Sequence, residues 1–97
     1  MFIGACKVKL RLPENHSLKG KRHVLKSVIA RVRNEFNVAI AEVESQDLWQ
    51  VAHLGICCVS NDPKHAEEMI AKTINFIERS RIDAELIDYE TEVIESF

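Results

Sequence analysis

Apolar residues recur along this 97-residue chain with two different periods, and the change from one period to the other predicts its secondary structure. Residues 2–12 alternate between apolar and polar, as in a half-buried strand that Pro13 ends. The apolar side of this strand holds Val8, Leu10 and Leu12, and its polar side holds Lys7, Lys9 and Arg11. Further strands are predicted over 37–44, 50–59 and 84–94.

Two segments instead repeat their apolar residues with the period of a helix. The first runs from Ser17, a suitable N-cap, to about Glu35. The second covers 63–80, with Asp62 as its N-cap and Pro63 at its first helical position. The order βαββαβ predicts one ferredoxin-like α+β domain over residues 1–97. Its four-stranded antiparallel sheet should have the order 4-1-3-2, with both helices on one face.

The first helix carries positive charge at the end where a helix is already electropositive. Lys19, Lys21 and Arg22 fall near its start, where unpaired N–H groups and the macrodipole attract anions. At about 100° per residue, a basic row with an arc of roughly 60° is formed by Lys19, Arg22, Lys26 and Arg33. The row is roughly 20 Å long, which suits a nucleic-acid backbone. The alternative is a solvated helix face that keeps the protein soluble.

Charge is also divided along the chain. Residues 1–35 hold nine Lys and Arg against two Glu, a balance of +7, and residues 36–97 hold four against thirteen Asp and Glu, a balance of −9. The net charge of −2 therefore conceals a basic and an acidic part, which predicts an electrostatic dipole, internal ion pairing, or both.

The sheet face away from the helices has mixed chemistry. The cations of the first strand should meet Asp88, Glu90 and Glu92 of the fourth, which predicts a cross-strand ladder of ion pairs. The central strands lack the aromatic residues on which sheet-face RNA readers stack bases. Val51, Gly55, Cys57 and Val59 share the third strand's side with His53, so the sequence also predicts a homodimer, through this face or across an edge strand.

No residue pattern predicts catalysis, a metal site or a cofactor. The four histidines lack metal-ligand spacing, and no P-loop or nucleophile elbow is present. The pair Glu42 and Glu44 has the chemistry of metal ligands, but a charged strand edge is the favoured interpretation. Three cysteines without a CxxC pair or metal-ligand spacing, the lack of a signal-peptide layout and the lack of a long apolar run favour a cytoplasmic protein without a membrane partner.

Trp49 follows Asp47 and Leu48 in the turn before the third strand. Two interpretations remain open for it. An indole at a tip is a suitable anchor for a protein partner. It is equally able to fold back over the rim of the core, where its ring is buried and its N–H stays wet.

Several of these residues form motifs that resemble the YlxP-like family, also called domain of unknown function 503. The motifs are SLKGKR at 17–22, FNVAIAEV at 36–43 and DLWQ at 47–50. The resemblance covers essentially the whole chain. It implies a ferredoxin-like fold and a small bacterial cytosolic protein whose relatives are often encoded among translation and ribosome-maturation genes. It directs attention to Ser17, Lys19, Lys21, Arg22, Arg31, Glu42, Asp47 and Trp49.

Two functional hypotheses follow. The first is a non-catalytic RNA- or ribosome-associated protein that binds phosphates through Ser17, Lys19, Lys21, Arg22, Lys26, Arg31 and Arg33. The second is a dimeric regulatory or scaffold module that binds a protein or a small anion, with Trp49 as the partner contact.

Overall fold

The computed structural model describes residues 1–80 and 82–97, and its six elements follow the predicted order. The strands are β1 (Phe2–Arg11), β2 (Ala39–Glu44), β3 (Val51–Ser60) and β4 (Glu85–Glu95). The helices are α1 (Leu18–Glu35) and α2 (Pro63–Arg79). Every boundary lies within two residues of its prediction.

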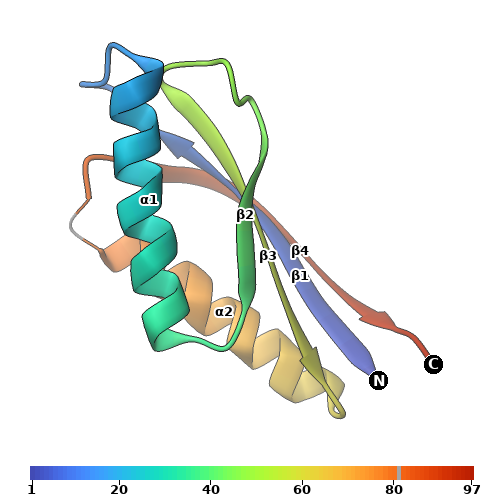
Figure 1. The fold of residues 1–97 in the computed structure, drawn as a ribbon. Coiled ribbons are helices and arrows are strands. Elements are labelled where there is room, and N and C mark those ends of the chain that lie inside the picture. The colour runs from blue at the N-terminus through green and yellow to red at the C-terminus, as the bar shows by residue number, and fades with distance from the viewer. Residues whose placement is uncertain (81) are drawn as a thin grey trace.

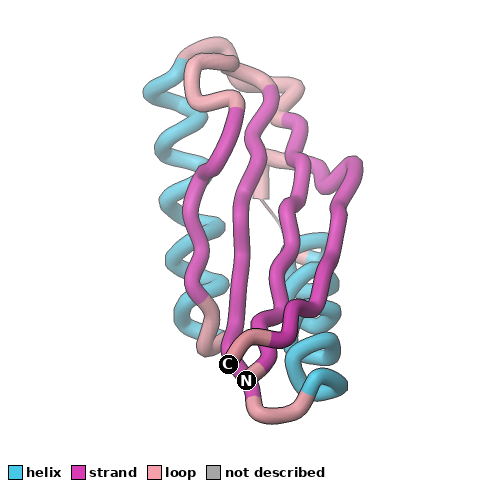
Figure 2. Tube along the Cα trace, turned by 90° about the vertical axis from the view of Figure 1, so that its right-hand side faces the viewer, coloured by secondary structure: helices cyan, strands magenta, loops and turns pink. Residues whose placement is uncertain are grey.

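The strands form one antiparallel sheet with the order β2-β3-β1-β4, which confirms the predicted ferredoxin-like α+β fold. Both helices lie on the same side of the sheet (Figure 1). The other side is left without a covering layer, and the two termini lie next to each other at one end (Figure 2). The Met1 ammonium donates to the backbone oxygen of Ser96 at 2.8 Å, which fastens these termini together.

The core lies between the helices and the inward side of β1 and β3. Alternate residues of both strands are buried, as the period-2 pattern predicted. The helices contribute Leu25, Val28, Val32, Ile70, Ile74 and Ile77. Cys6 and Cys58 belong to this core, and desolvation together with the neighbouring thiols raises the pKa of Cys6 to about 11. Cys57 points to the opposite face and is half-buried.

The predicted ion-pair ladder between β1 and β4 forms only in part. The register does place Lys7 opposite Glu90 and Lys9 opposite Asp88. However, the Lys7 ammonium binds Glu44 of β2 at 2.8 Å, reaching across β3. The ion pair that does join β1 to β4 is Arg11 with Glu85, also at 2.8 Å. Lys7 therefore pairs with Glu44 of the far edge strand β2, and not with an acid of β4 as the sequence predicted.

Candidate nucleic-acid interface

The start of α1 is held by two loops that meet there, 12–17 before the helix and 45–50 between β2 and β3. Ser17 is the N-cap, and its hydroxyl oxygen accepts from the Gly20 N–H at 2.9 Å. The Asn15 carboxamide donates to the backbone oxygens of Ser17 at 2.7 Å and Trp49 at 2.6 Å. The Gln50 carboxamide donates back to Pro13 and Asn15. We call this cluster of Asn15, Ser17, Lys21 and Gln50, with the two loops that it joins, the loop junction.

Lys21 departs from the prediction that it binds an anion. Its side chain is 1% exposed, and its ammonium binds Glu42 Oε2 at 2.8 Å. The same ammonium donates to the backbone oxygens of Ser45 at 2.5 Å and Leu48 at 2.8 Å. Because the ammonium is buried and surrounded by these three oxygens, a phosphate outside the protein has no access to it. Lys21 is therefore a structural cation of the loop junction.

The loop junction fixes an unusual backbone. Ser45 has φ of 62°, in the left-handed region that residues other than glycine seldom occupy. Its carbonyl oxygen is the closest partner of the Lys21 ammonium. Because that bond holds the strained residue in place, Lys21 determines the path that the loop takes from Ser45 to Trp49.

Trp49 does not fold back over the core. Its side chain is 54% exposed, and that of Leu48 is 49% exposed. Their backbone oxygens are held by Asn15 and Lys21, so both side chains project from an anchored loop. The interpretation that Trp49 folds back over the rim of the core is therefore wrong, and its role as a partner anchor stays a prediction.

All four cations of the basic row are exposed. Lys19, Arg22 and Lys26 are exposed and line one shallow groove of about 490 Å³, together with Glu42 and the edge of the core. The Glu42 charge is offset by Lys21 on the inside. Three exposed cations therefore face solvent around this groove, beside a helix start that has no acidic residue in its first turn.

The two later arginines are placed differently. Arg33 is exposed at the far end of the row, and its guanidinium donates to the backbone oxygen of Ile40 at 3.2 Å. Arg31 lies on another side of α1, beside a separate depression that it shares with His23, Ser27 and Asp83. The structure therefore brings Lys19, Arg22 and Lys26 together, with Arg33 further along the row and Arg31 apart from it.

The remaining polar side chains of the described residues do not gather into a metal site. Within 1–80 and 82–97, no three His, Cys, Asp or Glu side chains gather as a metal-binding group. His53 lies 4.0 Å from Glu44 and shares a hydrogen bond with the Ser45 hydroxyl. No helix in the described part of the chain has the length and apolar character needed to cross a membrane.

Sequence reasoning missed Asn15 and Gln50, whose side chains join the two loops. Asn15 belongs to none of the motifs, and Gln50 stood only as the last residue of DLWQ, with no contact assigned to it. The backbone oxygens that join the two loops, those of Trp49 and Pro13, are more than 30 residues away in sequence. A helical wheel does contain a signal for Lys21. At about 100° per residue it lies about 200° from Lys19, in the arc of Leu25, Val28 and Val32 rather than in the basic row.

Comparison with known proteins agrees with the motifs. A family model described as "Protein of unknown function (DUF503)" matches residues 3–91. The chain is also 38% identical over 77 residues to the uncharacterized protein YlxP of Bacillus subtilis (strain 168), a match that covers 79% of this chain and 84% of that protein. The loop junction and the exposed basic row are thus features of a chain that belongs to the DUF503, or YlxP-like, family.

Proposed function

We propose that this protein is a non-catalytic RNA- or ribosome-associated factor that binds the phosphate backbone through α1. The observation that carries the proposal is the groove at the helix start, where Lys19, Arg22 and Lys26 converge without an unbalanced acid. Arg33 extends the row to 14 residues beyond Lys19, about 21 Å along the helix. Such a row spans several consecutive phosphates, whereas a small anion needs one cluster.

Trp49 supports the same proposal from the adjoining loop. Its exposed indole lies at the end of the molecule where α1 starts, because Asn15 joins its backbone to the N-cap residue Ser17. An indole beside a basic surface is suited to stacking on an unpaired base, which contributes about 1–3 kcal/mol per base. We therefore favour a single-stranded or looped RNA over a regular duplex.

The test is RNA binding across a salt series. Three or four phosphate contacts predict a slope of log K against log salt of about −2 to −3, at about −0.7 per contact on a single strand. The variant Lys19→Glu with Arg22→Glu should lose binding. A matched control, Lys64→Glu with Lys72→Glu, makes the same charge change at exposed positions of α2 and should bind as the parent does. Equal loss in both variants, or in neither, would contradict the proposal.

A second candidate function is the dimeric scaffold or regulatory module. It is favoured by the exposure of Leu48 and Trp49, which is typical of a protein anchor. Under this alternative, Trp49→Ala abolishes partner capture while the Lys19→Glu, Arg22→Glu variant retains it. Sedimentation of the parent chain tests the dimer separately, because a monomer at micromolar concentration excludes it.

A further inference from the structure

The outer edge of β4 is a long uncovered part of the sheet. All residues of 87–95 are exposed, on both faces of the strand. β4 is the last strand in the sheet order, so along its outer side the described chain places no strand against its backbone N–H and C=O groups. Such an edge is a ready template for another extended chain.

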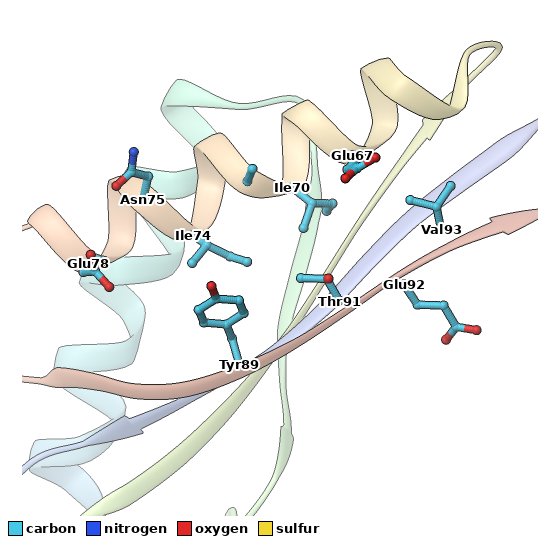
Figure 3. A pocket seen from close by; sticks show the side chains of 10 residues that line it. Glu67, Ile70, Ile74, Asn75, Glu78, Tyr89, Thr91, Glu92 and Val93 are labelled. Atoms are coloured by element: carbon cyan, nitrogen blue, oxygen red, sulfur yellow. The ribbon is translucent and has the colours of Figure 1, made fainter.

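The two faces of this edge differ in chemistry. Towards α2, Tyr89, Thr91 and Val93 line a groove of about 570 Å³ together with Ile70 and Ile74 (Figure 3). Tyr89 is 52% exposed and Val93 is 38% exposed, so this apolar floor is open to solvent. The other face carries the acidic residues of the strand. In Figure 3 the Glu92 side chain points away from α2, and Asp88 and Glu90 lie opposite Lys9 and Lys7 in the register.

Among the described residues, the acidic face of β4 is only partly neutralised by β1. Lys7 and Lys9 lie opposite Glu90 and Asp88, but Lys7 pairs with Glu44 and Lys9 forms no ion pair. Among the described residues, no ion pair is formed by Asp88, Glu90 or Glu92. The whole strand holds five acidic residues and no cation. A second copy that paired β4 with β4 would set acids against acids, which disfavours that occupant.

We propose that β4 binds an extended segment of a basic protein partner as a fifth strand of the sheet. In such a segment Lys or Arg alternates with apolar residues. Because strand side chains alternate between faces, the cations would lie beside Asp88, Glu90 and Glu92 while the apolar residues cover Tyr89 and Val93. β1 already presents this pattern to the inner side of β4, as Lys7, Val8 and Lys9. The proposed partner segment would repeat this alternation of cationic and apolar residues along the outer side of β4.

The first experiment uses three labelled seven-residue peptides and the full-length chain. The parent peptide, TKVKVKT, alternates lysine and valine. TEVEVET reverses its charge, and TKKVVKT keeps its composition without the alternation. Fluorescence anisotropy should show binding of the parent, no binding of the acidic peptide, and roughly ten-fold weaker binding of the scrambled one. Equal binding of the parent and scrambled peptides would overturn the proposal, because charge alone would then explain capture.

Backbone methylation tests strand addition itself. In an antiparallel pair, alternate residues turn their N–H groups towards the neighbouring strand. Methylating the backbone nitrogens of the valines, or of the lysines, therefore blocks opposite edges of the peptide. One methylated peptide should lose binding and the other should keep it. If the two methylated peptides bind equally, the peptide does not extend the sheet.

Protein variants locate the site. Glu90→Lys with Glu92→Lys should weaken binding of TKVKVKT by at least roughly ten-fold, since two attractions become repulsions. Glu14→Lys with Glu35→Lys makes the same charge change at exposed positions outside β4 and should leave binding unchanged. Glu90→Gln with Glu92→Gln should weaken peptide binding by an intermediate amount. This variant places no lysine beside Lys7, so it keeps the test valid if the lysine variant fails to fold. Unchanged binding by the glutamine variant would place the peptide elsewhere. RNA binding through α1 should be the same in the two variants that change Glu90 and Glu92.

Discussion

Lys21 provides the sharpest test of how the start of α1 is built. Replacing it with Met keeps a flexible chain of similar length inside the loop junction but removes the ammonium. The change leaves the Glu42 carboxylate without its cation, and it removes one hydrogen bond from each of the Ser45 and Leu48 carbonyls. The variant therefore separates the charge and hydrogen bonding of Lys21 from its packing.

The magnitude follows from burial. Removing one partner of a fully buried ion pair destabilises a protein by about 3–5 kcal/mol, because the remaining charge is left uncompensated. The Glu42 side chain is 21% exposed and recovers part of its hydration, which lowers this figure. Two carbonyls that lose a donor add to it. We expect Lys21→Met to lower the free energy of unfolding by about 2–4 kcal/mol, or roughly 10–20 °C in Tm for a domain of this size.

Urea unfolding measures this quantity, with Lys19→Met and Arg22→Met as controls. Both control residues are exposed on the same helix turns, so each should stay within about 0.5 kcal/mol of the parent chain. Adding Glu42→Met to Lys21→Met should restore part of the loss, since it removes the stranded carboxylate. A Lys21→Met variant as stable as the two controls would refute the assignment of Lys21 as a structural cation.

Three other predictions concern separate parts of the fold. Alanine normally favours a helix by about 1 kcal/mol over glycine, but Gly20→Ala should destabilise this protein, because a Cβ there would collide with the Asn15 carboxamide oxygen. In an Asn15→Ala background the same change should become stabilising, and thermal melting measures both effects. The hydrogen bond from the Lys7 ammonium lowers the pKa of the Glu44 carboxyl. The contribution of this pair to stability is therefore present above the unfolded-state pKa of Glu44 and is lost as pH falls through its folded-state pKa. In Lys7→Met the Glu44 pKa should return towards its usual range, as measured by NMR titration. At pH 8, Cys57 should be alkylated before Cys6, whose thiol pKa is raised to about 11 by burial, and mass spectrometry of Cys57→Ser should show the fast reaction gone.

Local patterns were sufficient to predict the fold because each element carries its own period and its own boundary residue. Ser17, Asp62 and Pro63 begin the helices where the sequence indicated, and the alternation in β1 orients Val8 and Leu10 inward. Side-chain partners could not be predicted in the same way. Lys7 reaches Glu44 across an intervening strand, and this pairing depends on the register of three strands at once.

The loop junction illustrates the same limit at the candidate site. A basic residue near a helix start was interpreted as part of a surface, although its position on the helical wheel already lay among Leu25, Val28 and Val32. The wheel indicates that Lys21 faces inward, but nothing local reveals what it meets there. Its partners are Glu42 in β2 and the backbone of the loop after β2, more than 20 residues away in sequence, so they become visible only when the tertiary structure is known.

The burial of Lys21 also bears on why Trp49 lies at the surface. A buried ion pair contributes little net stability, and an apolar pair of similar volume often serves as well. An apolar side chain, however, would remove the Lys21 bonds to the Ser45 and Leu48 carbonyls, and the Ser45 carbonyl would keep only the Leu48 N–H as its donor. The specific result of using lysine is therefore a loop that is rigid while its large side chains stay exposed. Under the RNA-binding proposal, the exposed indole of Trp49 is therefore ordered before any partner binds.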